Sequence, residues 1–105
     1  MTVRQGQVWR VDLDPTIGSE IRKTRPAVIV SPDELNAHLR TVVVVPLTTG
    51  RAYPFRIPTR VRKTDGIAAV DQIRTIDRRR LVKRIATLKP RTLRAVLDAL
   101  VEMFS

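Results

Sequence analysis

Two runs of β-branched residues constrain the fold of this chain more than any other feature. The segments from Ala27 to Val30 and from Val42 to Leu47 are continuously apolar, without the alternating polar residues of a strand that faces water. Such runs are typical of central strands that are covered on both faces. We therefore expect a β-sheet core with material packed on each side of it.

Shorter patterns predict the strands around this centre. Gln7 to Leu13 alternates between apolar and polar residues, which predicts a half-buried strand with Trp9 in the core or at an interface. Tyr53 to Ile57 also alternates, but Pro54 and Pro58 restrict that strand to the edge of a sheet. A turn at Asp65–Gly66 is expected to precede two further strands, Ile67 to Asp71 and Leu81 to Leu88. Asp14 to Thr24 lacks any periodicity and is expected to be a long surface loop.

Helix signals occur at three places. Ser31, Pro32 and Glu34 have the spacing of a capping box, which predicts a short helix that runs to Leu39. Asp77 is placed to cap a short turn that extends through Arg80. Pro90 opens the longest predicted helix, where Lys89 offers no side-chain cap and the apolar residues form one stripe: Leu93, Val96, Leu97, Leu100, Val101 and Phe104.

These elements predict a single domain over residues 1–105 that is mainly β with added helices. Five to seven short strands are expected to curl into a small barrel, and the C-terminal helix is expected to lie against it. The chain contains no internal repeat, low-complexity tract or linker. A domain of this size has a real core, but an additional interface would help to stabilise it.

Charge gives the first indication of a partner. Twenty Lys and Arg against ten Asp and Glu give a net charge of +10, and residues 51–94 hold 14 basic but only three acidic residues. This composition favours a nucleic-acid partner, although acidic proteins and anionic membranes would also be attracted. The absence of cysteine excludes disulfides, thiolate nucleophiles and Cys-ligated zinc. The longest strictly apolar run, Val42 to Val45, is too short to span a membrane, and no signal peptide opens the chain, so we expect a cytoplasmic protein without a membrane partner.

Four segments resemble the MazF/PemK toxin family in the order of that family. They are VDLDPTIGSE, TRPAVIVSP, VVVVPLTTG with YPF shortly after it, and GIAAVDQIRTIDRRRL. The resemblance implies a CcdB/MazF-like, SH3-like curled β-barrel that forms a homodimer. It also implies a toxin endoribonuclease that cleaves single-stranded RNA at short sequence motifs, needs no metal or other cofactor, and is neutralised by a cognate antitoxin with a flexible acidic segment.

Cleavage of RNA without a metal requires help with proton transfer and with the extra charge of the phosphorane. Arg25 resembles the catalytic arginine of the family, and Pro26 biases it towards extended geometry at the entrance to a strand. Its guanidinium suits two phosphate oxygens, and a guanidinium is seldom neutral near pH 7, which favours charge stabilisation over a role as base. Thr48 corresponds to the catalytic threonine of the family, and its hydroxyl would donate to a phosphorane oxygen.

Two carboxylates are candidates for proton transfer. Glu20 is either a base or orienting group, or an ion-pair partner of Arg22 or Arg25, and the sequence does not separate these roles. Asp71 occupies a position where some family members are thought to use an acid as base. Those members have a basic residue two positions earlier, where this chain has Ala69, so Asp71 ranks below Arg25 and Thr48.

The remaining candidates would bind RNA. Arg74 would contact phosphate, Gln72 and Thr49 lie within the matched motifs, and Phe55 and Tyr53 would stack on bases or pack in the core. The run from Arg78 to Arg80 is expected to be a solvated face. His38 is the single histidine, so a pair of histidines cannot supply the acid and the base within one chain.

Two other functions are compatible with parts of this pattern. A CcdB-like toxin of the same fold would act on DNA gyrase without cleaving RNA. A basic module that coats nucleic acid would present aromatic residues on a basic face, and this chain contains only 4% aromatic residues. The retention of Arg25 and Thr48 favours the nuclease over both.

Overall fold

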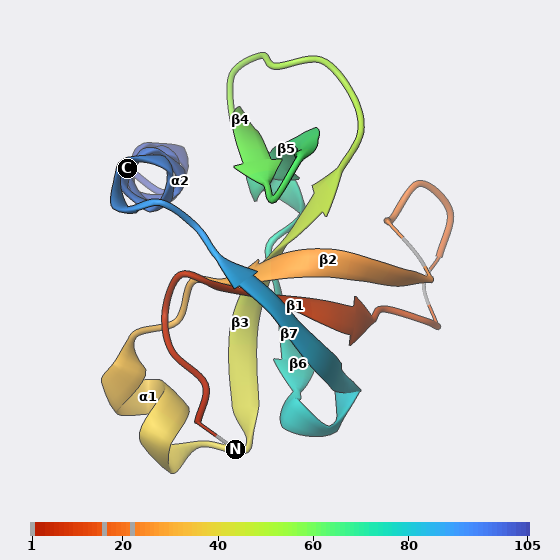
Figure 1. Cartoon of the computed structure of the whole chain (residues 1–105), viewed down its shortest axis with the longest axis vertical. Coiled ribbons are helices and arrows are strands. Elements are labelled where there is room, and N and C mark those ends of the chain that lie inside the picture. The colour runs from red at the N-terminus through yellow and green to blue at the C-terminus, as the bar shows by residue number, and fades with distance from the viewer. Residues whose placement is uncertain (1, 16, 22) are drawn as a thin grey trace.

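The computed structural model describes residues 2–15, 17–21 and 23–105. Seven strands form one strongly curled sheet, and two α-helices lie on the same side of it (Figure 1). The strands are β1 (Gln7–Asp12), β2 (Thr24–Ile29), β3 (Thr41–Thr48), β4 (Arg56–Val61), β5 (Thr64–Ala69), β6 (Arg74–Asp77) and β7 (Leu81–Thr87). The helices are α1 (Asp33–His38) and α2 (Pro90–Met103), and the short 3₁₀ turns are η1 (Val70–Gln72) and η2 (Arg78–Arg80).

The strand order explains why the sheet curls into a half-barrel. The order is β4-β5-β3-β2-β1-β7, and β6 pairs with β3 outside this path. β3 therefore pairs with β2 and β6 near its start and middle, and with β5 at its end. Because β3 pairs with three neighbours, the sheet bends along β3, and β2, β1 and β7 follow it in that order (Figure 1). The predicted β-barrel with a C-terminal helix is confirmed.

The two β-branched runs form the central strands β2 and β3, as predicted. Along β3, Val44 packs into the cluster that contains Trp9, whereas Val45 packs into the cluster beneath α2. Along β2, Ile29 and Val28 divide between the same two clusters. Each run is apolar at successive positions because both faces of the sheet are covered.

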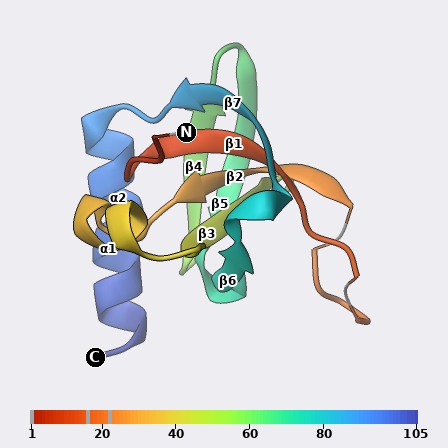
Figure 2. The same cartoon turned by 90° about the horizontal axis from the view of Figure 1, so that it is seen from below.

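The terminal helix α2 covers one face of the sheet. It begins at Pro90 as predicted, with Lys89 as an N-cap whose side chain makes no capping hydrogen bond. Val96 is fully buried and Ala99 nearly so, while Val101 and Phe104 are 68% and 73% exposed. The predicted apolar stripe is therefore wrong at its C-terminal end, because α2 extends past the sheet that it covers (Figure 2).

The start of the short helix differs from the prediction. α1 begins at Asp33 with Pro32 as N-cap, and no side chain caps it. The Ser31 hydroxyl instead donates to Asn36 Oδ1 at 2.6 Å and accepts from the backbone N–H of Val43 at 3.1 Å. Ser31 is thus used to join α1 to the sheet. The helix ends at His38, which is exposed.

Several boundaries around β4 and β5 were predicted wrongly. The connecting turn lies at Arg62 and Lys63, where Arg62 takes the left-handed conformation with φ of 57°, and not at Asp65–Gly66, which lies within β5. β4 begins only at Arg56, because Phe55 has φ of 66° and cannot continue an extended strand backwards. Residues 70–72 leave β5 as η1. The edge position of β4 and the cap that Asp77 forms on Arg79 N–H are confirmed.

Candidate active site

Arg25 and Thr48 are brought together by the pairing of β2 with β3. The antiparallel register ends with Ala27 opposite Pro46, and Arg25 and Thr48 each lie two residues beyond this pair, at the same end of the two strands. Both residues line a cavity of about 410 Å³ at the end of these strands. Arg25 and Thr48 are half-buried, with part of each side chain open to a ligand. The two residues that the sequence ranked first as catalytic candidates therefore share one site.

Further charged groups surround this cavity, which we call the Arg25 cavity. Arg10 of β1 and Arg62 of the β4–β5 turn also line it, together with Asp65. The Arg62 guanidinium donates to the Ile85 carbonyl at 2.9 Å, and Asp65 is paired with Arg60 at 2.9 Å. Three guanidinium groups thus line a space suited to phosphate oxygens. Arg10 and Arg62 were not predicted from the sequence, since only their place in the fold distinguishes them from other surface arginines.

A second cavity, of about 400 Å³, lies beside the β1–β2 loop, and we call it the loop cavity. Glu20, Asp71, Gln72 and Arg74 line it together with Pro46. Pro46 lies two residues before Thr48 on β3, so the two cavities adjoin along the end of this strand. The candidate residues therefore divide between two neighbouring cavities rather than forming one cluster.

Three candidates in the loop cavity fasten the β1–β2 loop. Glu20 Oε1 accepts from the N–H of Ile17 at 2.6 Å, and Gln72 Oε1 accepts from the N–H of Ile21 at 2.8 Å. The Arg74 guanidinium donates to the Leu13 carbonyl at 3.2 Å. An ion pair of Glu20 with Arg22 was one expectation, and Arg22 lies outside the described residues. These contacts shape the wall of the cavity that faces the loop.

Asp71 is held in a two-point ion pair. Arg56 Nε lies 2.5 Å from Asp71 Oδ1, and Arg56 Nη2 lies 2.7 Å from Oδ2. This hydrogen bonding lowers the pKa of the Asp71 carboxyl below its ordinary value of 3.8. The Arg56 guanidinium also lies 5.5 Å from the centre of the Tyr53 ring. Each oxygen of Asp71 therefore accepts a hydrogen bond from Arg56, which makes the carboxylate less available to accept a proton.

The other candidates lie in different surroundings. Thr49 is exposed and lines the Arg25 cavity, whereas Phe55 packs against the core cluster beneath α2. Tyr53 is 56% exposed. Trp9 is buried, and its Nε1 donates to Gln7 Oε1 at 3.0 Å.

The run from Arg78 to Arg80 is a solvated face only at Arg79, whose side chain is 90% exposed. Arg78 and Arg80 are half-buried and donate to backbone carbonyls of Asn36 and of Asp12 and Asp14, respectively. The prediction for this run was wrong at two positions because the fold places carbonyl acceptors beside these side chains.

Metal-ligand clusters and membrane-spanning helices are both absent from the described ranges. Residues 2–15, 17–21 and 23–105 contain no group of three or more His, Cys, Asp or Glu side chains placed to hold a metal ion. The same ranges contain no helix long and apolar enough to cross a membrane.

Comparison with known proteins places this geometry in a family. Residues 4–104 match the family described as PemK-like, MazF-like toxin of type II toxin-antitoxin system. The chain is 37% identical over 109 residues to Endoribonuclease MazF9 of Mycobacterium tuberculosis, an alignment that covers 93% of this chain and 92% of the relative.

Solved structures agree with this assignment. A crystal structure of MazF from Deinococcus radiodurans matches with a TM-score of 0.88 at 23% identity, covering 99% of this chain and 97% of that one. An endoribonuclease in complex with its cognate antitoxin, from a mycobacterial species, matches with a TM-score of 0.82 at 28% identity, covering 97% and 94%. The resemblance drawn from the sequence motifs is therefore confirmed. The chain belongs to the PemK-like, MazF-like toxins of type II toxin–antitoxin systems, and its sequence and fold are those of a MazF-type endoribonuclease toxin.

Proposed function

We propose that this toxin cleaves single-stranded RNA at the Arg25 cavity, using the ribose 2′-hydroxyl as the nucleophile. The 2′-oxygen forms a bond to the adjacent phosphorus, and the bond from phosphorus to the 5′-oxygen breaks. A base takes the proton of the 2′-hydroxyl, and the leaving 5′-oxygen receives a proton. The products are a 2′,3′-cyclic phosphate and a 5′-hydroxyl. The observation that carries this proposal is the placement of Arg25 beside Thr48 in one cavity of a MazF-like chain.

The role of each residue follows from its chemistry. Arg25 offers a fork of N–H donors to the phosphorane oxygens and donates a proton to the leaving oxygen. Thr48 donates its hydroxyl to a phosphorane oxygen, and the backbone N–H groups of Thr49 and Gly50 extend this set of donors. Such donors stabilise the transition state most when they are fixed before the substrate arrives, and β2–β3 pairing fixes the two strands that carry Arg25 and Thr48.

Glu20 is the better of the two candidate carboxylates for accepting the proton. Among the described residues, Glu20 accepts a hydrogen bond at Oε1 from the Ile17 N–H, whereas both oxygens of Asp71 are held by Arg56. A base must also be substantially ionised yet basic enough to take a proton, and the lowered pKa of Asp71 makes it weaker in this role. We therefore assign proton acceptance to Glu20 and the positioning of Arg56 to Asp71.

RNA on either side of the cut would contact the loop cavity. Arg74 supplies a guanidinium for phosphate, and Gln72 supplies an amide for a base edge. Thr49 would contact the nucleotide in the Arg25 cavity. The exposed ring of Tyr53 is better placed to stack on a base than that of Phe55, which packs against the core.

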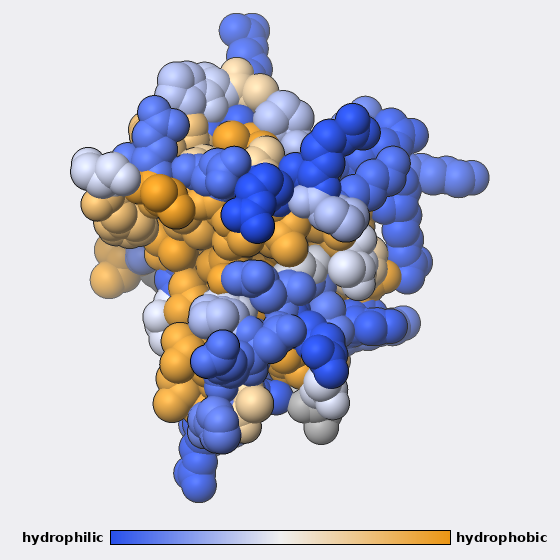
Figure 3. Space-filling model, turned by 90° about the vertical axis from the view of Figure 1, so that its left-hand side faces the viewer, coloured by the Kyte–Doolittle hydropathy of each residue, from blue (hydrophilic) through white to orange (hydrophobic). Residues whose placement is uncertain are grey.

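We further propose that the toxin is a homodimer that pairs through the side carrying the two helices. Hydrophobic residues cover much of this side (Figure 3). Both helices present large exposed apolar side chains: Leu35 in α1, Val101 in α2 and Phe104 directly after α2. Exposed apolar area of this extent on a 105-residue chain is typical of an interaction surface.

The partner that controls the toxin is a cognate antitoxin, as in the mycobacterial complex that this chain resembles. A flexible acidic segment would be attracted by the net charge of +10. Its carboxylates would take the place of RNA phosphates near Arg25 and Arg74. RNA and antitoxin should then compete for one surface, and their association should slow as the salt concentration rises.

The test is cleavage of a defined RNA by the purified protein in excess EDTA, followed by analysis of the ends. We expect cleavage to continue and to leave a 2′,3′-cyclic phosphate and a 5′-hydroxyl. An RNA in which the nucleotide at the cut carries a 2′-deoxyribose should be inert. Loss of activity on chelation with recovery in magnesium would contradict the mechanism. Failure to cut any RNA, together with inhibition of DNA gyrase, would favour the CcdB-like alternative.

A further inference from the structure

A third cavity, of about 590 Å³, lies away from both cavities described above, and we call it the N-terminal cavity. It is formed by the N-terminal segment, α1 and the residue that follows β6. Three guanidinium groups line it, those of Arg4, Arg40 and Arg78, against the single carboxylate of Asp33. Arg4 is paired with Asp33 and Arg40 lies near Asp77, but three cations against these two carboxylates leave the cluster positively charged, so it would attract an anionic ligand.

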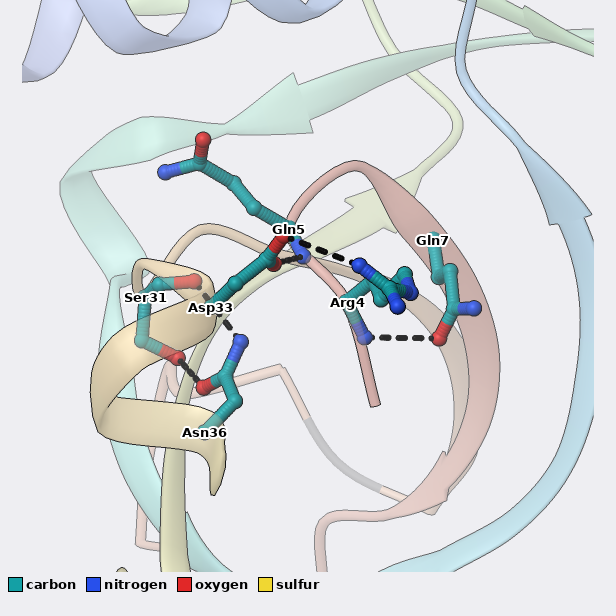
Figure 4. A network of polar contacts seen from close by, with 6 residues as sticks. All are labelled: Arg4, Gln5, Gln7, Ser31, Asp33 and Asn36. Carbon is teal, nitrogen blue, oxygen red and sulfur yellow. Dashed lines mark hydrogen bonds and ion pairs between the residues drawn. The ribbon is translucent and has the colours of Figure 1, made fainter. Parts of the chain in front are cut away.

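A polar network fixes the walls of this cavity (Figure 4). Asp33 Oδ1 accepts from the backbone N–H of Gln5 at 2.7 Å, and Asp33 Oδ2 lies 3.5 Å from the Arg4 guanidinium. The backbone N–H of Arg4 donates to Gln7 Oε1 at 3.0 Å. The N-terminal segment is thereby tied to α1 on one side and to β1 on the other. A site whose walls are already ordered loses less conformational entropy on binding.

The cations differ in how firmly they are held. Arg78 donates to the carbonyl of Asn36, a residue that is only 2% exposed and is itself bonded to Ser31. Arg4 is 65% exposed at its side chain and shares Asp33, and Arg40 is exposed at the rim. Arg78 is thus a fixed part of the wall, whereas Arg4 and Arg40 are accessible to a ligand.

Strand β6 connects this cavity to the loop cavity. Arg74 begins β6 and lines the loop cavity, and Arg78 directly follows β6 and lines the N-terminal cavity. Four residues at about 3.3 Å each separate them by about 13 Å. Among the described strands β6 pairs with β3, and Thr75 in the middle of β6 is exposed between the two cavities. A single strand of RNA bound at the loop cavity therefore has a short path to the N-terminal cavity.

We propose that the N-terminal cavity is a second contact for the RNA substrate, which binds a backbone phosphate a few nucleotides away from the cut. None of the described residues that line it is aromatic, so it offers no ring on which a base could stack. Phosphate recognition without base readout adds affinity for longer RNA and leaves the cleavage motif unchanged. This inference rests on the proposed function, because it assumes that RNA occupies the loop cavity.

The experiment measures binding of non-cleavable 2′-deoxy oligonucleotides to the full chain by fluorescence anisotropy. One oligonucleotide holds only the cleavage motif, and two others extend it at the 5′ or the 3′ side. The wild type should bind one of the extended oligonucleotides more tightly. Arg40→Gln and Arg4→Gln should remove that gain, and each should reduce the slope of log affinity against log salt by about 0.7. Asp33→Asn, which retains an oxygen for the Gln5 N–H, should act in the opposite direction and tighten binding.

Arg91→Gln is the matched control, because Arg91 is an exposed arginine of α2 that lines none of the three cavities. Equal loss in Arg40→Gln and Arg91→Gln would overturn the proposal, as would equal loss for short and extended oligonucleotides. Weakened binding of an acidic peptide with unchanged binding of extended oligonucleotides would show a protein site instead. A wild type that binds the extended oligonucleotide as described but never cuts the matching RNA would contradict the proposed function alone.

Discussion

The carbonyl oxygen of Thr48 lies directly against Gly66, so close that a Cβ at Gly66 would stand 2.8 Å from it. Gly66 lies in β5 opposite Thr59 of β4, and Thr48 pairs with its neighbour Ile67. Real Cβ atoms do not approach backbone oxygen atoms so closely, so any side chain at Gly66 would push the end of β3 away. The glycine is required here by close packing and sets the position of the Thr48 backbone.

Gly66→Ala should therefore reduce cleavage by displacing Thr48. We expect a loss in kcat of about 10-fold or more, because small shifts of a positioned group have large effects on rate. The measurement is single-turnover cleavage of a defined RNA. In a Thr48→Ala background, Gly66→Ala should have little further effect, because the group on which it acts is gone. Losses that multiply in the double variant would show that Gly66 acts elsewhere.

Arg25→Ala should lower the cleavage rate by at least about 100-fold, since removing one oxyanion donor costs about 2.7–4 kcal/mol. Its thermal midpoint should change little, because Arg25 lies at a cavity and outside the core clusters. Thr48→Val should lower the cleavage rate less than Arg25→Ala does, because a hydroxyl carries less charge than a guanidinium. Arg94→Ala, at an exposed position of α2, is the control and should cut normally. Normal cutting by Arg25→Ala, or its unfolding, would make Arg25 a structural residue.

Asp71→Asn should affect stability more than chemistry. It removes a charge that holds Arg56, whose side chain is only 17% exposed. Since Asp71 itself is 43% exposed and therefore screened, we expect a loss of about 1 kcal/mol, or about 4 °C in thermal midpoint. Cleavage at neutral pH should fall by much less than in Arg25→Ala. A loss as large as that of Arg25→Ala with an unchanged midpoint would identify Asp71 as the base.

The same ion pair predicts how stability depends on pH. The folded pKa of Asp71 lies below its ordinary value of 3.8, so the stabilising charge is present above that pH and is lost as the pH falls through the folded pKa. The difference in thermal midpoint between wild type and Asp71→Asn should therefore be largest at about pH 6. The two midpoints should converge as the pH falls below about 4. Thermal unfolding across this range measures the difference, and a gap that stays constant down to pH 2 would exclude this ion pair as its cause.

The proposed dimer surface can be tested at α2. Phe104→Glu should dissociate the dimer, because it places a charge among exposed apolar side chains that the partner would cover. Sedimentation should then give a mass near 11.9 kDa instead of twice that value. Val82→Glu is the control, since Val82 is 60% exposed on β7, away from both helices. A wild type that is monomeric and still cuts RNA would contradict the proposed dimer.

Local sequence was sufficient for the features that depend on neighbouring residues. The β-branched runs specified β2 and β3, and Pro90 with its apolar spacing specified α2. Asp77 capped the next turn as its position predicts, because a cap needs only the two residues that follow it. The ordered motifs also identified the family and, with it, Arg25 and Thr48 as the pair to examine.

Tertiary packing decided the features whose cause lies far away in sequence. Asp65–Gly66 has the composition of a turn, but Gly66 is needed inside β5 because the Thr48 carbonyl lies against it. Ser31 has the position of a helix cap, but its hydroxyl serves Asn36 and the N–H of Val43 instead. In each case a contact with β3 overrides the local preference: the Ser31 hydroxyl satisfies the N–H of Val43, and Gly66 leaves room for the Thr48 carbonyl.

The candidate site depended on both the sequence and the tertiary structure. Sequence determined which residues have suitable chemistry, because side-chain type sets charge, hydrogen bonding and reactivity wherever the residue lies. Only the fold placed Arg25 and Thr48 in one cavity, joined Arg10 and Arg62 to that cavity, and engaged Asp71 with Arg56 across 15 positions of the chain. The physical reason is that strand pairing brings together segments distant in sequence. Which charged side chains meet at paired strands depends on the register of the strands and on burial. Neither can be predicted from a local sequence pattern.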